Sequence, residues 1–366
     1  MNKSNGSQTI LFAAVLPPPV HGQSVVTEAF LNILRISGSK VKLVNTSPEN
    51  LNRGISYHWR RIFSNFNVAL QATRLAVNRT PRTLYMVVDS NIGLLYNIFV
   101  AGLCRILRFR TFYHHHTAAS CLSTHPLMAV FLIVAGPLST QILLSQQMAV
   151  DLIRRYGFLG RTLVCHNAAF KNPTPIRQRA ANDPPYTIGF MSNISIEKGI
   201  KEAIDTFSKG FNSGLFKKLI LAGPILDHTS RKIISGAITN FGDAVEYRGA
   251  VNEAEKKLFF DEIDIFVFPT RYKYEAQPLV ILESFSNGVP VIAYDRGYVK
   301  ELVIINGWAI SSHEEFSVRA IEIIIKWGGI DRHIWNINTA QKSRQLRHKA
   351  QKFLSALLDN MTLPLT

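Results

Sequence analysis

The chain has 366 residues, of which 47% are hydrophobic, so it is long enough for two domains that each bury a core. With 18% charged residues, it is not a disordered or fibrous protein. The formal net charge of +16 favours an acidic partner: nucleic acid, an anionic membrane face or a phosphorylated substrate. The three cysteines form no CxxC pair and, being odd in number, no complete disulfide framework, which favours a reducing compartment.

Strands and helices alternate through the N-terminal half, which favours βαβ units and a parallel sheet. Strands are expected at residues 9–16, 41–45, 84–88, 111–114 and 141–144, and helices at 23–36, 59–77 and 91–107. The apolar run at 10–16 is interpreted as a buried strand rather than a signal peptide. The helix at 59–77 is expected to carry Arg60, Arg61 and Arg74 on its polar side.

Residues 122–150 contain no Asp, Glu, Lys or Arg, and residues 126–134 are entirely apolar. Gly136 and Pro137 interrupt this stretch, so we expect a buried or interfacial helix followed by a strand, not a membrane span.

Four prolines mark residues 170–185 as a linker. Beyond it the alternation resumes, with strands expected at 187–191, 218–222, 244–247, 263–269 and 289–294, and helices at 197–207, 253–260 and 278–287. Two such blocks predict an α/β protein with two doubly wound domains and a cleft between them. Ligands in such sheets bind beyond the carboxyl ends of the strands.

The segment YKYEAQPLVILESFSNGVPVIAYDRGYV at 272–299 places polar residues between a buried strand and a helix. Glu275 precedes the helix and Glu283 lies within it. The N–H groups and positive dipole end of a helix N-terminus suit a diphosphate, and carboxylates accept hydrogen bonds from sugar and ribose hydroxyls. An acidic cap and a solvated helix glutamate would be the alternative interpretation.

This segment resembles the donor-binding signature of the family 4 retaining glycosyltransferases, which have the GT-B fold of two Rossmann-like domains. That signature has two glutamates separated by seven residues and then Gly-x-Pro-Val-Ile/Val-Ala. Here it is matched by Glu275, Glu283 and the run from Gly288 to Ala293. The resemblance implies that Glu275 contacts the transferred sugar as a catalytic-site residue and that Glu283 binds the nucleotide ribose.

A second segment, IGFMSNISIEKG at 188–199, is similar to the family element Gly-Arg-Leu-x-x-x-Lys-Gly, whose Arg and Lys hold the donor diphosphate. Lys198 falls on the lysine, whereas Asn193 replaces the arginine. An asparagine can donate a hydrogen bond but cannot offset charge, so the second cation is either supplied elsewhere or absent.

Further positions follow from the resemblance. The donor diphosphate and sugar are expected at Gly22, Asn193, Lys198, Gln277, Pro278 and Leu279, and the nucleotide at Gly223, Arg248, Gly249, Val251 and Glu283. In the N-terminal half, Gly22 lies in a strand-to-helix loop, PPPVHGQS, where the family has a glycine. His116 and Thr117 match a His-Thr pair near the reacting sugar, so His116 is a second predicted catalytic residue.

His114, His115 and His116 are adjacent, but neighbours on an extended chain point to opposite sides, so a shared metal ion is not expected. The resemblance also implies that no metal or other cofactor is needed. It predicts N-terminal and C-terminal Rossmann-like domains at 1–170 and 186–345, a linker at 171–185, and a helix at 346–366 that packs back on the first domain.

The expected activity is glycosyl transfer from a nucleoside diphosphate sugar to a hydroxyl of a saccharide or lipid-linked saccharide, with retention, by front-face attack. A hexosyl or N-acetylhexosaminyl group would serve cell-surface polysaccharide or lipopolysaccharide assembly at the cytoplasmic membrane face. The apolar 126–134 run and the basic region at 59–79 would contact an anionic membrane surface.

Three alternatives remain open. A GT-B sugar-nucleotide epimerase would use the same carboxylates and histidine without an acceptor. A non-catalytic GT-B binding protein has Asn193 in its favour. A nucleic-acid binder is permitted by the charge, but the sequence contains no basic and aromatic array, and nucleic acid is not an expected partner.

Overall fold

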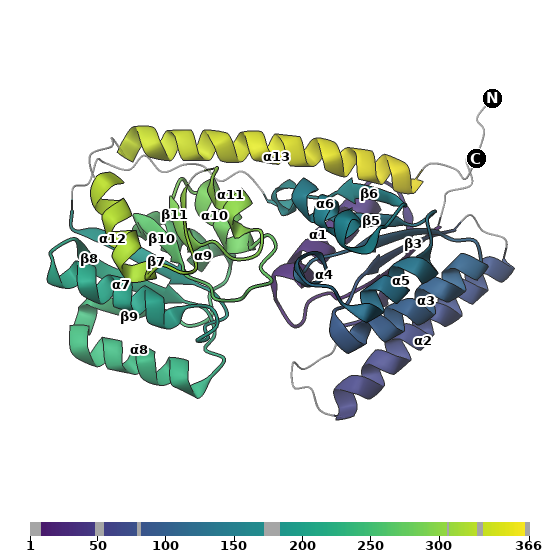
Figure 1. The fold of residues 1–366 in the computed structure, drawn as a ribbon, viewed down its shortest axis with the longest axis horizontal. Helices are drawn as coiled ribbons and strands as arrows, with labels where there is room; N and C mark the ends of the chain where they lie inside the picture. The colour runs from purple at the N-terminus through teal and green to yellow at the C-terminus, as the bar shows by residue number, and fades with distance from the viewer. Residues whose placement is uncertain are drawn as a thin grey trace. The chain divides into compact units, whose positions relative to one another are not determined.

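The computed structural model describes residues 9–47, 55–78, 82–171, 184–305, 307–327 and 332–362, which form two compact units (Figure 1). The first unit comprises Met1–Phe170 with Lys349–Thr366, and the second comprises Lys171–His348. The long helix α13 (Arg332–Thr362) therefore contributes residues to both. Residues 172–183 of the predicted linker lie outside the described residues.

The first unit is built on a parallel sheet of six strands. In spatial order these are β2 (Lys40–Asn45), β1 (Thr9–Ala14), β3 (Arg82–Val87), β4 (Arg110–His114), β5 (Thr140–Leu143) and β6 (Arg161–Val164). The chain moves from β1 outward to β2 and then returns to β3 on the other side of β1. This reversal is the switch point at which doubly wound sheets bind ligands.

Helices connect these strands in the βαβ pattern that the sequence predicts. They are α1 (Gly22–Ile36), α2 (Ile55–Val77), η1 (Asn91–Gly93), α3 (Leu94–Ile106), α4 (Ala119–Leu122), α5 (Pro126–Ala135), α6 (Gln146–Tyr156) and η2 (Asn167–Phe170). α1 begins with a capping box, in which Nδ1 of His21 accepts from the Ser24 backbone N–H at 3.3 Å and the Ser24 hydroxyl accepts from the His21 N–H at 3.0 Å. No described helix is both long and apolar enough to cross a membrane.

The arginines of α2 do not all lie on the predicted polar side. Arg60 and Arg74 are exposed as predicted, but Arg61 is buried and forms an ion pair with Asp89. Asp89 also accepts a hydrogen bond from the Asn97 side-chain amide at 3.2 Å. Helical spacing indicates which residues share a face, but it cannot show that a half-buried carboxylate distant in sequence pairs with one arginine of that face.

The second unit repeats the plan with another six-stranded parallel sheet. Its spatial order is β12 (Gly307–Ile310), β11 (Val291–Tyr294), β10 (Ile265–Phe268), β7 (Tyr186–Met191), β8 (Phe216–Ala222) and β9 (Val245–Tyr247). The switch point lies between β7 and β10, because the chain runs outward from β7 to β9 and then returns. The predicted pair of doubly wound α/β units is thus confirmed.

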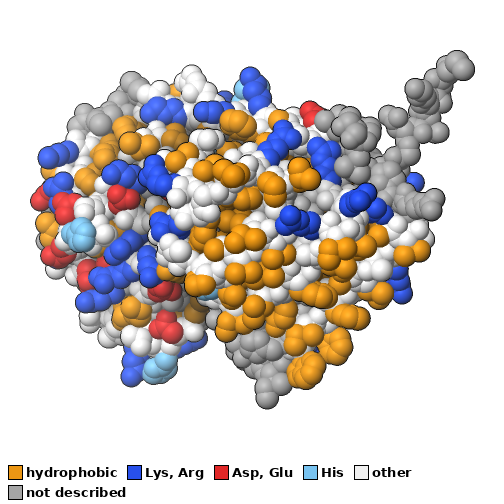
Figure 2. All heavy atoms as spheres, turned by 45° about the vertical axis from the view of Figure 1, so that its right-hand side comes forward, with side chains coloured by type: hydrophobic (Ala, Val, Ile, Leu, Met, Phe, Trp, Pro, Cys, Tyr) orange, Lys and Arg blue, Asp and Glu red, His pale blue; other side chains and the backbone are white. Residues whose placement is uncertain are grey.

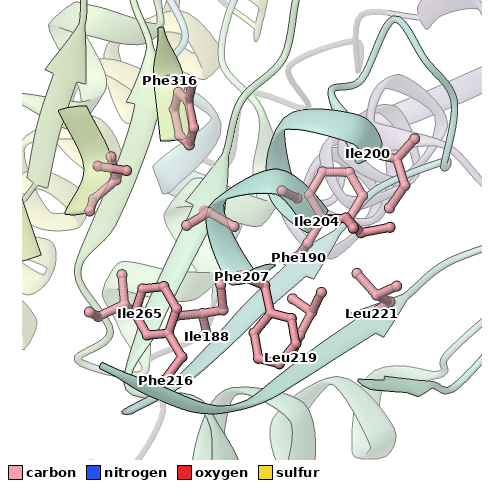
Figure 3. Packing of buried hydrophobic residues seen from close by; sticks show 14 of the residues in the cluster. Ile188, Phe190, Ile200, Ile204, Phe207, Phe216, Leu219, Leu221, Ile265 and Phe316 are labelled. Carbon is pink, nitrogen blue, oxygen red and sulfur yellow. The ribbon is translucent and has the colours of Figure 1, made fainter. Parts of the chain in front are cut away.

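The helices of the second unit are α7 (Ile200–Asn212), α8 (His228–Phe241), η3 (Gly242–Ala244), α9 (Glu253–Glu262), α10 (Leu279–Ser286), α11 (Val299–Val303), α12 (Phe316–Trp327) and the first part of α13. The apolar side of α7, including Ile200, Ile204 and Phe207, packs on Phe190 and Leu219 of the sheet (Figure 3). This core fixes the start of α7, and with it the loop that follows β7.

All three cysteines, Cys104, Cys121 and Cys165, are buried in the first unit, and none of them forms a disulfide bond. Burial raises the pKa of Cys104 and of Cys165 to about 12. These thiols are therefore protonated and unreactive at neutral pH.

Candidate functional site

The loop between β7 and α7 presents Lys198 at the switch point of the second sheet. The Lys198 backbone N–H donates to the Ser195 hydroxyl at 3.2 Å, and the Gly199 N–H donates to the Ile196 carbonyl at 3.0 Å. Gly199 has a φ of 87°, and a Cβ there would overlap the carbonyl oxygen of Pro269. Only glycine therefore allows the loop to pass so close to the end of β10.

Glu275 lies in the adjoining loop, between β10 and α10, and its side chain meets Lys198. The Lys198 ammonium forms an ion pair with Oε1 of Glu275, which also accepts from the Thr270 hydroxyl at 3.1 Å. Lys198 lies 4.9 Å from the centroid of the Tyr272 ring. The predicted phosphate-binding and sugar-binding side chains are thus in direct contact, although 77 residues separate them.

The backbone of Glu275 is held from the other side by the loop after β11. The Tyr298 N–H donates to the Glu275 carbonyl at 2.9 Å. Gly297 has a φ of 58°, and a Cβ there would overlap that same carbonyl. Loops that follow β7, β10 and β11 therefore meet at Glu275, the first two at its carboxylate and the third at its backbone.

The start of α10 adds backbone N–H groups to the site around Lys198 and Glu275. Pro278 is its N-cap and makes no side-chain hydrogen bond, Leu279 is its first residue, and Gln277 before it is buried. The first-turn N–H groups of α10 are therefore not capped by the residue that precedes them, and such groups bind anions.

Glu283, one turn further along α10, is paired with two lysines. Its Oε1 contacts Nζ of Lys171 in an ion pair and Nζ of Lys256 at 3.5 Å. Lys256 also pairs with Glu253 at 2.7 Å. Burial acts to lower the pKa of Lys256, but the two carboxylates outweigh it and raise that pKa.

The predicted nucleotide-binding residues lie at the ends of β8 and β9. The Gly223 N–H donates to the Gly249 carbonyl at 2.6 Å, and the Tyr247 hydroxyl donates to the Gly223 carbonyl at 3.0 Å. These bonds join the two turns. Val251 is half-buried just beyond them.

The side chains of Arg248 and Asn193, both predicted to bind the donor, have different environments. The Arg248 guanidinium is paired with Glu246 at 2.7 Å and with Glu262 at 2.6 Å, and hydrogen bonding to Arg248 helps lower the pKa of Glu246 to about 2. Asn193 is exposed in the loop that carries Lys198. The arginine side chain is thus engaged within the protein, while the Asn193 amide faces solvent.

The predicted N-terminal residues belong to the first unit, at the carboxyl ends of β1 and β4. Gly22 is the exposed first residue of α1, and His116 follows β4. The His116 ring lies against the His114 ring with centroids 4.0 Å apart and the planes tilted by 38°, and the Tyr85 hydroxyl is hydrogen-bonded to Nδ1 of His114 at 2.6 Å. The imidazole is thus positioned by residues of two neighbouring strands.

His116 is a neutral imidazole. Burial, followed by the nearby His115 and His21, lowers its pKa to about 3. Among the described residues none hydrogen-bonds to its buried Nε2. His115 points to the other side and bonds with Gln141 at 2.8 Å. Within the described ranges, no group of three or more His, Cys, Asp or Glu side chains is arranged to hold a metal ion.

Sequence reasoning missed the residues that hold the predicted ones in place. Lys171 and Lys256 belong to no recognisable motif, because they meet Glu283 only through the fold. Thr270 and Tyr272 lie in the loop of Glu275, but no pattern marked them as its and Lys198's neighbours. Of the residues predicted to bind the donor, Asn193 has an exposed side chain, and the Arg248 side chain is paired with Glu246 and Glu262 rather than directed to a ligand.

Comparisons with known proteins concern the second unit and the fold of the whole chain. Residues 172–342 match the family described as Glycosyl transferases group 1, so the second unit contains a domain of that kind. The alpha-monoglucosyldiacylglycerol synthase of Streptococcus pneumoniae (strain ATCC BAA-255 / R6) is 29% identical over 123 residues, which cover 33% of this chain. The match spans only 27% of that relative.

Solved structures define the fold of the whole chain as GT-B. HepE of Anabaena in complex with UDP aligns over 96% of this chain and 100% of its own, with a TM-score of 0.69 and 17% identity. The sucrose-phosphate synthase of Thermosynechococcus elongatus aligns over 96% and 98%, with a TM-score of 0.70 and 16% identity. The lipopolysaccharide outer core galactosyltransferase WaaB aligns over 96% and 99%, with a TM-score of 0.65 and 13% identity.

Proposed function

We propose that the chain is a retaining glycosyltransferase of family 4, which transfers a sugar from a nucleoside diphosphate sugar to a hydroxyl group. The observation that carries this proposal is the contact between Lys198 and Glu275 beside the N-terminus of α10, within a domain that matches the group 1 glycosyl transferases. HepE, which has the same fold, has been solved with UDP and with UDP-glucose.

In the proposed reaction the donor diphosphate lies between Lys198 and the first turn of α10. Both supply positive charge that is fixed before the reaction, which stabilises the charge that develops on the departing diphosphate. Glu275, held by Thr270 and Tyr298, accepts hydrogen bonds from hydroxyls of the transferred sugar. As the family resemblance implies, no metal ion takes part.

Retention follows from front-face attack in this proposal. The acceptor oxygen forms a bond to the anomeric carbon on the side from which the diphosphate leaves. The acceptor proton passes to the departing phosphate oxygen. His116 acts as a neutral hydrogen-bonding group near the sugar, because its pKa of about 3 rules out a standing positive charge at neutral pH.

The nucleotide is proposed to bind at Glu283 and at the joined turns of Gly223 and Gly249. Lys171 and Lys256 both contact Oε1 of Glu283, so Oε2 can accept the ribose hydroxyls. The pairing fixes the carboxylate before the nucleotide arrives, which reduces the entropy cost of binding. Arg248 acts through its backbone, because its side chain is engaged by Glu246 and Glu262.

The proposed acceptor is a saccharide or lipid-linked saccharide of cell-surface polysaccharide synthesis at the cytoplasmic membrane face. Two relatives support a glycolipid-related acceptor by name: the pneumococcal alpha-monoglucosyldiacylglycerol synthase and the lipopolysaccharide outer core galactosyltransferase. Whether a hexosyl or an N-acetylhexosaminyl group is transferred is part of the same test.

The test is a thermal-shift screen of nucleoside diphosphates and their sugars, followed by NMR of the anomeric proton of the product. Stabilisation by one nucleoside diphosphate, and a product with the donor's anomeric configuration, are expected. If no nucleotide stabilises the protein, the proposed donor site is wrong. If a nucleotide sugar changes without an acceptor, the epimerase is favoured, and binding without any turnover would favour a non-catalytic protein.

A further inference from the structure

Helix α2 carries its largest apolar side chains on the outside of the first unit. The exposed residues recur every three or four positions along one stripe, which consists of Trp59, Ile62, Phe63, Phe66 and Leu70, with Val77 at the far end. The inward face instead holds the buried Arg61 and Asn65 with Val68, Ala69 and Ala72. A helix that faced only water would have the opposite arrangement.

Helices α3 and α5 continue this apolar surface. α3 packs against both α2 and α5, so the three helices form one layer. Their exposed apolar residues are Ile92, Leu95, Phe99, Ile106, Val130, Ile133 and Leu138, counting the segments next to each helix. Together with the α2 stripe they form what we call the α2–α3–α5 face, and hydrophobic side chains gather over this side of the first unit in Figure 2.

The charged side chains of this region are almost all positive. Between residues 55 and 150 the sequence has eight arginines, no lysine and a single carboxylate, Asp89, which is engaged by Arg61. Arg60 and Arg74 of α2 are exposed beside the apolar stripe. Arg105 of α3 is also exposed, and its guanidinium donates to the carbonyls of Ile133 at 2.9 Å and Val134 at 3.2 Å. Arginines bind phosphate groups through several parallel hydrogen bonds, so they suit an anionic surface.

We propose that the α2–α3–α5 face binds the surface of an anionic lipid bilayer. The apolar stripe enters the boundary between headgroups and acyl chains, and the arginines contact lipid phosphates. A bilayer fits better than a protein partner because the face combines a wide apolar stripe with cations and lacks the acidic groups that pair across protein interfaces. The inference rests on the proposed function, which places the acceptor at a membrane face, and it names the surface that meets that membrane; none of its residues belongs to the proposed donor site.

The proposal is tested by flotation of the purified protein with vesicles of equal parts phosphatidylglycerol and phosphatidylcholine, and with phosphatidylcholine alone. The wild type is expected to float with the anionic vesicles, more weakly at high salt. The double variant Phe63→Ser/Phe66→Ser should partition about tenfold or more weakly, because two exposed rings no longer enter the bilayer. Arg74→Gln should weaken binding several-fold on anionic vesicles only.

Phe353→Ser is the matched control, because Phe353 is a 43% exposed phenylalanine on α13, outside this face. Trp59 provides a second readout: its fluorescence should shift to the blue when anionic vesicles are added, and Trp59→Phe should remove that shift. Thermal-shift binding of the nucleotide should be the same in wild type and variants, which separates this test from that of the donor site.

Three results would overturn the proposal. One is a wild type that stays with the soluble fraction at low salt. Another is equal loss of flotation in Phe353→Ser. The third is a wild type that sediments as a dimer without vesicles while Phe63→Ser/Phe66→Ser sediments as a monomer, which would assign the face to a second copy of the chain.

Discussion

Lys198 links the proposed diphosphate site to the proposed sugar site, which the sequence suggests separately. Its ammonium contacts Glu275 and lies over the Tyr272 ring, so the group proposed for the diphosphate also neutralises the carboxylate proposed for the sugar. Removing either partner leaves the other as an uncompensated charge in a half-buried place. Substitutions at the two positions should therefore not be additive.

The variant Lys198→Ala should weaken binding of the nucleoside diphosphate about ten- to hundredfold, because a charge-assisted hydrogen bond to phosphate is lost. Lys201→Ala is the control, since Lys201 is an exposed lysine of the same helix region. Isothermal titration calorimetry measures both. Equal affinity in the two variants would remove Lys198 from the site.

Asn193 offers a gain-of-function test at the same scale. Asn193→Arg should tighten nucleotide binding by about tenfold, because it would add a second cation beside the diphosphate. Asn193→Gln is the neutral control, which should leave the affinity unchanged. Calorimetry at two salt concentrations checks the electrostatic origin, since an unchanged or weaker affinity of the arginine variant would place the phosphate away from residue 193.

At the scale of elements, strands and helices were the most predictable part of the fold. Near-continuous apolar runs such as that of β10 predict strands buried on both faces, and all four residues of β10 are buried. The predicted helix at 278–287 became α10, Leu279–Ser286. The burial of Arg61 in α2 was not predictable, because its partner Asp89 lies 28 positions further along the chain.

The proposed donor site shows the same limit. The motif around Glu275, Glu283 and Lys198 could be recognised in the sequence, whereas the lysines that hold Glu283 could not. Lys171 is 112 positions from Glu283, and a lone lysine in a proline-rich stretch has no distinguishing pattern. Contacts between distant loops depend on the strand order, which local spacing does not specify.

The loop before α7 should be sensitive to its glycine. Gly199→Ala should lower the free energy of unfolding of the second unit by about 1–3 kcal/mol, because alanine is strained at positive φ and its Cβ meets Pro269. Gly236→Ala in α8 is the control: a Cβ there meets open space, so it should stabilise by about 0.5–1 kcal/mol. Urea denaturation measures both, and a neutral Gly199→Ala would contradict the strained loop.

At the scale of the whole molecule, the first unit should lose stability in mild acid. Burial lowers the pKa of His115 and of His166 to about 4, and that of His116 to about 3, from an ordinary 6.5. The unfolded chain therefore binds more protons than the folded one between pH 6.5 and 4. Stability is complete above pH 6.5 and falls below it, by up to about 1.4 kcal/mol per histidine per pH unit.

His166→Asn separates one of these histidines from the rest. The ring Nδ1 accepts the Ala168 N–H at 3.0 Å, and an asparagine oxygen can accept the same bond without titrating. The variant should show a shallower fall of the unfolding free energy between pH 6.5 and 4.5 than the wild type. Parallel curves would mean that His166 is protonated equally in the folded and unfolded states.

Because cysteines occur in one unit only, thiol chemistry can follow that unit separately from the other. Every thiol of the chain lies in the first unit, sealed within its core, and the second unit has none. A thiol reagent can therefore reach sulfur only when the first unit opens, whatever the second unit does. The rate of thiol labelling in native buffer would report the opening of one half of the molecule alone, with no engineered probe.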